Sequence, residues 1–270
     1  MPGILRLIHP APTAAVVTLS GALAAILSAQ AGEPPLTGRV VLTILAVLGS
    51  QVLTGALNDW ADRDRDRDAQ RSKPIPAGEA TPRAALALAA AGGALQLIAS
   101  VPLGVPALLL GATASASAAT YNLWLSRSPL SVLPYLVSFG LLPLWVAAGV
   151  GVPLERVAAA PLLVGPFAAS AHLANTLRDF DADARLGSRN LAQTLGRRPA
   201  FALAWTMAAG VGVVAGAGLA LTDRLETGGT ILGLAGLIAV AQGIAGTQRL
   251  WVGMLAAAVC WTAAWALATG

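Results

Sequence analysis

Residues 40–68 read VVLTILAVLGSQVLTGALNDWADRDRDRD, an apolar run that ends in a dense cluster of acidic and basic side chains. The apolar part, 40–58, is close to the about 20 residues with which a helix crosses a bilayer. The stretch therefore predicts a membrane-spanning helix whose end carries charged groups at the membrane surface.

Similar apolar runs recur along the whole chain. Hydrophobic residues make up 56% of its 270 residues and charged residues only 11%, whereas a soluble domain carries about 25% charged residues. The predicted spans are 12–30, 40–58, 84–101, 105–123, 130–150, 157–177, 199–221, 230–246 and 249–268. We expect an all-α membrane protein of nine transmembrane helices, with residues 1–270 as a single domain and no cleaved targeting segment.

The distribution of the basic residues predicts the topology. The net charge of +4 could indicate nucleic-acid binding, but the basic residues lie in short connectors, where they set membrane orientation. With a cytoplasmic N-terminus, 14 of the 17 basic residues fall on the cytoplasmic side, and only Arg39, Arg156 and Arg224 fall outside. We therefore expect no nucleic-acid partner, a multi-pass protein of the inner (plasma) membrane, and an external C-terminus.

Two acidic motifs share the pattern Asn-xxx-Asp-xxx-Asp, and each follows a predicted span. Asn58, Asp62 and Asp66 form the first, with Asp59 beside them, and Asn175, Asp179 and Asp183 form the second. If the helix continues through each motif, residues four apart share one helix face. Each motif would then present its asparagine and two carboxylates as one stripe of oxygen atoms along the helix. Mg²⁺ takes carboxylates, waters and substrate phosphates as ligands. Two such stripes could therefore hold Mg²⁺ around a diphosphate and help its C–O bond to break.

Other charged side chains near the motifs have a simpler interpretation. Asp64, Asp68 and Asp181 lie off the stripes, so we expect them to be solvated connector residues. After the first motif, Pro74 and Pro76 exclude a regular helix and predict a stiff loop.

This loop could carry Arg71 and Lys73 back over the site, where both would bind phosphate oxygens. The same two residues also satisfy the positive-inside rule, so a purely topological role remains open.

Together these motifs resemble those of the UbiA superfamily of intramembrane prenyltransferases. Its first signature, N-D-x-x-D-x-x-x-D, is matched at every fixed position by residues 58–66, and residues 71–78, RSKPIPAG, are similar to the basic loop that follows it. Its second signature, D-x-x-x-D, is matched by Asp179 and Asp183, followed by Gly187. The resemblance spans nearly the whole chain.

The resemblance implies a nine-helix bundle around a central cavity that holds the prenyl tail of an isoprenyl diphosphate. The diphosphate would be bound through Mg²⁺ between the two motifs, and an acceptor would attack the allylic cation. One element departs from the family, which often has a Tyr followed shortly by a Lys after the fourth helix. Here Tyr121 is followed by Ser126 and Arg127, so Arg127 would replace that Lys in phosphate binding, and Tyr121 could equally be an interfacial anchor.

Four functions remain open from the sequence. The first is transfer of a prenyl group to an aromatic or lipid-like acceptor. The second is intramembrane terpene cyclisation, and the third is transfer of a phosphorylated sugar, as in phosphoribosyl transfer to a polyprenyl phosphate. The fourth is transport, which the position of the acidic residues at span ends disfavours, because transporters place coupling residues near the midplane. Prenyl transfer is the function that we expect, with Asp62, Asp66, Asp179 and Asp183 as its catalytic carboxylates.

Overall fold

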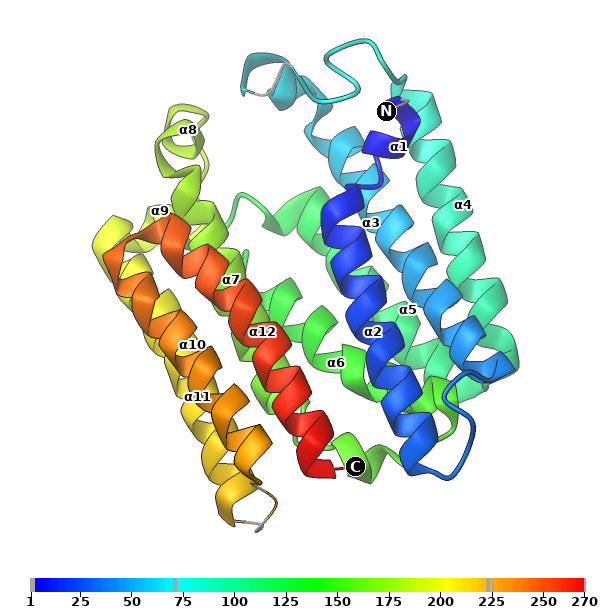
Figure 1. Ribbon diagram of the computed structural model, residues 1–270. Coiled ribbons are helices and arrows are strands. Elements are labelled where there is room, and N and C mark those ends of the chain that lie inside the picture. Colours follow the sequence, from blue (N-terminus) through cyan, green and yellow to red (C-terminus); the bar gives the residue numbers. More distant parts are fainter. Residues whose placement is uncertain (1–2, 70–71, 222–223, 225, 270) are drawn as a thin grey trace. The chain divides into compact units, whose positions relative to one another are not determined.

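The computed structural model describes residues 3–69, 72–221, 224 and 226–269, and within these ranges every regular element is helical. The chain packs as two compact units, one made of Met1–Ser126 and Val137–Pro161 and the other of Arg127–Leu136 and Leu162–Gly270. Figure 1 follows the helices in chain order.

The first unit holds α1 (Gly3–Arg6), α2 (Pro10–Gln30), α3 (Gly38–Ala69), α4 (Pro82–Ser100), η1 (Val101–Leu103), α5 (Val105–Thr120), η2 (Tyr121–Leu125), most of α6 (Leu133–Val150) and η3 (Leu154–Val157). The second holds the start of α6, then α7 (Pro161–Arg178), α8 (Phe180–Arg185), α9 (Leu191–Leu195), α10 (Arg197–Leu221), α11 (Thr227–Gln242), η4 (Gly243–Ala245) and α12 (Thr247–Thr269).

Each of the nine predicted spans corresponds to one of the long helices. In the described part of the chain, seven are long and apolar enough to cross a membrane, namely α2, α3, α4, α6, α10, α11 and α12. Helix α5 has only 16 residues and α7 is not among the seven, so the count of nine spans stays a prediction. The chain is an integral membrane protein with an all-helical fold.

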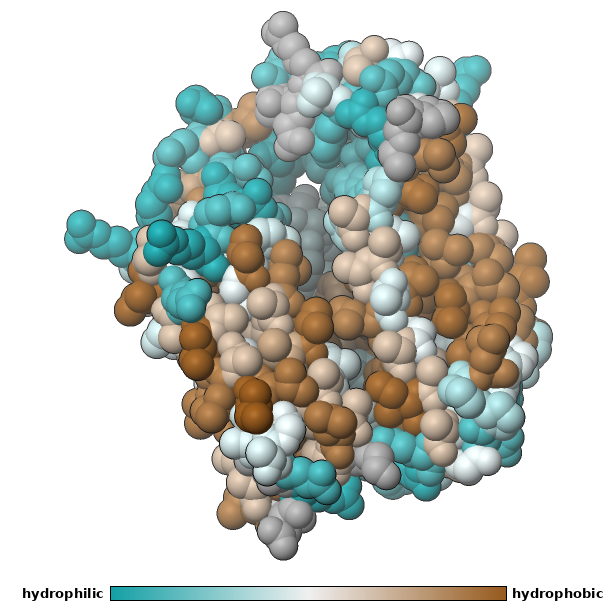
Figure 2. All heavy atoms as spheres, viewed as in Figure 1, coloured by the Kyte–Doolittle hydropathy of each residue, from teal (hydrophilic) through white to brown (hydrophobic). Residues whose placement is uncertain are grey.

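The surface of the helices matches a lipid environment. Large apolar side chains point outward, with Ile98 on α4 72% exposed and Ile231 on α11 61% exposed. Figure 2 shows hydrophobic residues along the flanks of the helices and hydrophilic residues gathered toward their ends. In water such exposure would be costly, whereas lipid tails are as apolar as these side chains.

Glycine lets α3 and α4 touch along their backbones in the first unit. A Cβ on Gly49 of α3 would lie 2.6 Å from the carbonyl oxygen of Gly92, and a Cβ on Gly92 would lie 2.5 Å from the backbone nitrogen of Leu53. Small residues allow this approach in membranes, where packing replaces the hydrophobic effect as the main attraction between helices.

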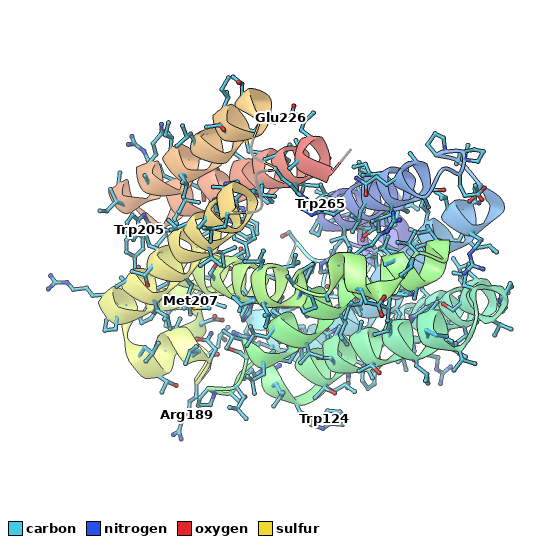
Figure 3. The ribbon with its side chains drawn as sticks, turned by 90° about the horizontal axis from the view of Figure 1, so that it is seen from below. Trp124, Arg189, Trp205, Met207, Glu226 and Trp265 are labelled. Carbon is cyan, nitrogen blue, oxygen red and sulfur yellow. The ribbon has the colours of Figure 1, made fainter. Side chains whose placement is uncertain are left out.

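In the second unit α11 and α12 make a similar contact, because Gly253 packs directly on the carbonyl group of Ala239. Trp205 of α10, labelled in Figure 3, donates a hydrogen bond of 3.0 Å from Nε1 to the carbonyl oxygen of Val240 on α11. Leu173, Leu177, Leu250 and Met254 are fully buried beside these contacts.

Helix α3 is longer than a membrane requires. Its 32 residues extend for about 48 Å at 1.5 Å per residue, whereas the hydrocarbon core is about 30 Å thick. The last turns of α3, which carry the first acidic motif, therefore continue past the apolar part of the helix.

The contact between α3 and α4 predicts different effects for two adjacent glycines. Gly92→Ala should lower the free energy of unfolding by about 1–3 kcal/mol, because its Cβ collides with backbone that cannot move aside. Gly93→Ala is the matched control, since its Cβ would meet its nearest neighbour, a terminal carbon of Leu53, only at 3.9 Å. Thermal unfolding in detergent measures both, and equal stability of the two variants would contradict this packing.

Candidate functional site

The first acidic motif lies on unbroken helix, as its spacing predicted. Because α3 continues to Ala69, Asn58, Asp62 and Asp66 follow one another on one helix face. Asp59 and Asp66 are only 2% and 3% exposed. Two carboxylates this deeply buried require partners, because desolvation of a charge without compensation costs several kcal/mol.

The main partner of these two carboxylates is Lys73, which follows the helix in the loop of residues 72–81. Its Nζ lies 3.1 Å from Asp59 Oδ1 and 3.0 Å from Asp66 Oδ2. Burial by itself would lower the pKa of Lys73, but the charges of Asp59 and Asp66 outweigh it and raise the pKa above its ordinary value. The ammonium group is therefore charged at neutral pH and neutralises part of the acidic motif.

The loop is closed by its own backbone and by the N-terminal segment. The N–H of Ala77 donates to the carbonyl oxygen of Lys73 at 2.9 Å. Arg6 pairs with Glu79 at 2.6 Å and also donates to the carbonyl oxygen of Ser72. These contacts hold the short segment that presents Lys73 to α3. Arg71, the other basic residue expected in this loop, lies outside the described residues.

His9 is a further partner of the motif that the sequence did not indicate. Its Nε2 lies 3.0 Å from Asp59 Oδ1, on the oxygen that Lys73 also contacts. His9 is the one described residue other than glycine with a positive φ, 50°, a conformation that is uncommon for such residues and is retained where the surroundings require it. The strained backbone directly before α2 thus brings the imidazole to Asp59.

Asn58 is linked to a second asparagine that sequence reasoning missed. Its Nδ2 lies 3.3 Å from Asp62 Oδ2 and 3.3 Å from the Oδ1 of Asn122. Asn122, in turn, donates from Nδ2 to the carbonyl oxygen of Thr54 at 2.8 Å. Asn122 is buried on the π-helical turn η2, directly after the half-buried Tyr121, and its place beside Tyr121 was the only signal that could have indicated it.

The second motif differs from the expected continuous helix. Helix α7 ends at Arg178 and α8 begins at Phe180, so Asp179 stands at the break, with φ −100° and ψ 12°. The N–H of Asp183 still donates to the carbonyl oxygen of Asp179 at 2.8 Å. The condition for a shared helix face, a helix that continues through the motif, is therefore not met at Asp179, which is exposed at the helix junction.

The two other members of this motif have neighbours within the second unit. Asn175 accepts a hydrogen bond of 3.2 Å from Arg178. Asp183 Oδ2 accepts one of 3.0 Å from the Nδ2 of Asn190. Asn190 is 1% exposed and caps α9, because its Oδ1 accepts from the N–H of Gln193 at 3.0 Å. The spacing Asn-x-x-Gln before an apolar run is a helix-capping signal, although it does not predict the bond to Asp183.

Arg127, expected to replace the lysine of the family, has an exposed side chain. Its carbonyl oxygen accepts a hydrogen bond of 3.1 Å from the N–H of Arg189, and the side chain of Arg189 extends away from the ribbon in Figure 3. The Oγ of the buried Ser131 accepts from the N–H of Leu191 at 3.3 Å. The structure thus joins the segment after Tyr121 to the segment after the second motif, within the second unit, through one backbone–backbone hydrogen bond and one bond to a serine side chain.

The acidic residues expected to be solvated are exposed. The Asp64 side chain is 68% exposed beside Arg63 and Arg67, and Asp181 pairs with Arg197 at 2.6 Å. Arg63 stacks its guanidinium on Trp60, 4.8 Å from the ring centroid, which directs it away from the carboxylate stripe.

The donor atoms of the first motif fit Mg²⁺. No group of three or more His, Cys, Asp or Glu side chains among the described residues forms a complete metal cage. Mg²⁺ does not require one, since it binds one or two carboxylates and completes its shell with water and substrate phosphates. Asp59 Oδ2 is buried and accepts no hydrogen bond from the described residues, and a hard cation is a suitable partner for such an oxygen.

Comparison with known proteins places the chain in a family. Residues 18–243 match the model of the UbiA prenyltransferase family. A digeranylgeranylglyceryl phosphate synthase of Halobacterium salinarum is 31% identical over 74% of this chain and 72% of that protein. A 4-hydroxybenzoate octaprenyltransferase of Cupriavidus necator is 29% identical over 71% of this chain and 68% of that protein. A protoheme IX farnesyltransferase of Symbiobacterium thermophilum matches over a shorter part, 43% of this chain and 40% of that protein, at 34% identity.

Solved structures agree on the fold. A UbiA homologue of Archaeoglobus fulgidus, bound to GPP and Mg²⁺, has a TM-score of 0.72 at 17% identity and covers 99% of this chain and 100% of its own. The apo structure of a UbiA homologue of Aeropyrum pernix K1 has a TM-score of 0.75 at 24% identity, covering 92% of this chain and 96% of its own.

The effects of the two side-chain hydrogen bonds of Asn190, one to Asp183 and one to the N–H of Gln193, can be separated by substitution. Asn190→Ser keeps an oxygen that can cap α9, whereas Asn190→Ala removes the cap and should cost about 1 kcal/mol more in stability. Both variants lose the hydrogen bond to Asp183, so if Asp183 is a metal ligand, both should show the same fall in Mg²⁺-dependent turnover, about tenfold. Thermal unfolding and turnover are measured in parallel. Restoration of turnover by serine would show that the cap, and not the bond to Asp183, matters.

Proposed function

The chain belongs to the UbiA prenyltransferase family, and from this premise we propose that it ionises an isoprenyl diphosphate and transfers the prenyl group to an aromatic or lipid-like acceptor. The observation that carries the proposal is the cation-binding arrangement at the end of α3. There Asp59 and Asp66 are buried around the Lys73 ammonium, with Asn58 and Asp62 on the same helix. This arrangement suits a cluster of cations and phosphate oxygens.

Each candidate residue of the two motifs and their connectors has a role in this proposal. The residues that would hold Mg²⁺ are Asn58, Asp59, Asp62, Asp66, Asp179 and Asp183, and those that would contact the diphosphate are Asn58, Arg71, Lys73, Tyr121, Arg127 and Asn175. Bound Mg²⁺ would neutralise the diphosphate leaving group and so lower the barrier to breaking the C–O bond.

Lys73 contributes a charge that the carboxylates keep in place. Its ammonium group can donate to a phosphate oxygen while its stem stays packed in the loop. His9 contacts the same oxygen of Asp59 as Lys73 and helps to orient that carboxylate. The prenyl chain would lie among the apolar helices, which exclude water from the allylic cation.

The relatives favour transfer over the other reactions. The name of the H. salinarum synthase contains glyceryl phosphate, which is a lipid-like acceptor. The name of the C. necator enzyme contains 4-hydroxybenzoate, which is an aromatic acceptor. The A. fulgidus homologue binds GPP and Mg²⁺, and GPP belongs to the isoprenyl diphosphates, the class of donor that we propose for this chain together with Mg²⁺. Cyclisation of the same donor is the second candidate, since it uses the same ionisation step without an acceptor.

The orientation in the membrane is part of the proposal. The 14-to-3 distribution of basic residues supports a cytoplasmic N-terminus, cytoplasmic acidic motifs and an external C-terminus. We further propose that the two units act as one catalytic domain of the inner membrane, because both carry a motif of the same reaction.

The first experiment separates transfer from cyclisation. The purified protein is incubated with Mg²⁺ and isoprenyl diphosphates of several chain lengths, without acceptor, and the products are identified by mass spectrometry. Mg²⁺-dependent binding of one chain length without turnover supports transfer, and cyclic hydrocarbon supports cyclisation. The proposal fails if neither binding nor turnover of any isoprenyl diphosphate depends on Mg²⁺.

Two carboxylates of the same helix provide a matched pair for this assay. Asp62→Asn removes a proposed ligand and should lower turnover by more than the about 10–100-fold that loss of an outer partner costs. Asp64→Asn removes the same charge from the exposed side of α3 and should change turnover by no more than about twofold, as expected for a solvated surface charge. Circular dichroism checks that both remain helical, and equal loss in the two variants would show that the functional face was misassigned.

Lys73 is the only lysine of the sequence, and its removal should affect both stability and substrate binding. Lys73→Met leaves Asp59 and Asp66 without their main cation, which should cost on the order of 3 kcal/mol in the free energy of unfolding. It should also weaken inorganic pyrophosphate binding, measured by calorimetry with Mg²⁺. Lys73→Arg, which keeps the charge, is the control and should retain most of the stability. A methionine variant as stable as the wild type would contradict the ion pairs.

A further inference from the structure

The amide of Asn58 poses a problem that the carboxylates of the motif do not. A carboxylate presents oxygen whichever way it rotates, whereas a half-turn of an asparagine side chain exchanges its oxygen for an NH₂ group. Only the oxygen can bind a cation. An asparagine in a metal site therefore needs neighbours that decide which end faces the ion.

The orientation of the Asn122 amide follows from its contact with a backbone carbonyl group. Asn122 Nδ2 lies 2.8 Å from the carbonyl oxygen of Thr54 on α3. A carbonyl oxygen can only accept a hydrogen bond, so the end of the Asn122 amide that faces Thr54 must be its NH₂ group. Asn122 is 8% exposed, which leaves little room for water to provide an alternative partner.

The orientation of Asn122 then determines that of Asn58. With the NH₂ group of Asn122 on Thr54, its Oδ1 points to the Asn58 amide, 3.3 Å from Nδ2. The second neighbour of this Nδ2 is the Oδ2 of Asp62, also at 3.3 Å, and ionised Asp likewise only accepts. Both hydrogens of the Asn58 amide are used, and its Oδ1 is the atom left for a cation.

The local fold explains how Asn122 reaches α3. In η2 the N–H of Ser126 donates to the carbonyl oxygen of Tyr121, five residues earlier, at 2.9 Å. Such a π-helical turn is wider than an α-helical one and recurs at functional sites. Asn122 is buried, whereas Trp124, two residues later, is 69% exposed and projects away from the helices in Figure 3.

From these contacts we infer that Asn122 is a positioning residue. Its own amide is oriented by the Thr54 carbonyl, and it in turn orients the Asn58 amide so that the Asn58 oxygen faces Mg²⁺. The inference rests on the proposed function, because it assigns Asn58 to the metal. It extends that function by naming a residue that touches neither the metal nor the diphosphate but sets the affinity for the metal.

The test measures metal binding without catalysis. Mn²⁺, a paramagnetic substitute for Mg²⁺, is titrated into the protein in detergent with inorganic pyrophosphate present, and electron paramagnetic resonance reports the free ion. Asn122→Leu keeps the branched shape and the number of side-chain heavy atoms but has no polar atoms, and it should weaken Mn²⁺ binding by about tenfold or more. Asn122→Ala, measured alongside, removes the same atoms with less bulk and should show the same loss.

The same substitution in an Asn58→Asp variant distinguishes an effect on the orientation of the residue-58 side chain from a general loss of protein stability. In Asn58→Asp the side chain presents oxygen in either rotation, so Asn122→Leu should cost no Mn²⁺ affinity there. Ser115→Ala serves as a control for loss of a buried polar contact in the same unit, because Ser115 bonds to Ser50 and Gln96 and not to the motif. It should leave Mn²⁺ binding unchanged, and thermal unfolding is recorded for every variant.

The outcomes separate the inference from the proposed function. The role of Asn122 is supported if Asn122→Leu lowers the Mn²⁺ affinity tenfold when residue 58 is asparagine and has no effect when it is aspartate. Unchanged binding in Asn122→Leu and Asn122→Ala, or an equal loss in both backgrounds, overturns that role while the proposed function stands. If the wild-type chain binds no Mn²⁺ with pyrophosphate, the proposed function itself fails, and the role of Asn122 fails with it.

Discussion

The burial of Asp59 and Asp66 at the end of one helix is the constraint on which the rest of the first unit depends. Carboxylates that are 2% and 3% exposed need opposite charge within contact distance, because desolvation is not otherwise compensated. Lys73 provides that charge at 3.0 and 3.1 Å. Arg6 holds the segment that carries Lys73 through its contacts with Glu79 and Ser72. The N-terminal segment is thereby part of the site.

Both units orient a motif residue through an asparagine whose amide is fixed by backbone, and the polarity is opposite in the two. Asn122 gives its NH₂ group to a carbonyl and offers oxygen to the amide of Asn58. The Oδ1 of Asn190 accepts a hydrogen bond from a backbone N–H, and its NH₂ group donates to the carboxylate of Asp183. Each arrangement suits its partner, because Asn58 needs an acceptor and Asp183 needs a donor. The backbone, which cannot rotate like a side chain, supplies the direction.

Sequence patterns predicted the helices well because the signals were local. Each predicted span corresponds to a helix, and the four-residue spacing of the first motif lies on unbroken α3. The second motif has the same spacing, but α7 ends and α8 begins on either side of Asp179, and an identical periodicity does not reveal a helix junction. His9 and Asn122 were missed for another reason. Their partners lie 50 and 64 residues away in the chain, beyond the reach of any periodic pattern.

The sequence by itself determined that the helices lie in lipid, the class of fold, and the residue types from which the site is proposed. Apolar runs of bilayer length require helices, and carboxylates at span ends require a partner that compensates their charge. Only the tertiary structure decided which carboxylates are buried, that Lys73 lies between Asp59 and Asp66, and that two asparagines orient two motif residues. The physical reason is that charge compensation and hydrogen-bond direction depend on distances of about 3 Å between groups, and folding alone brings distant residues within that range.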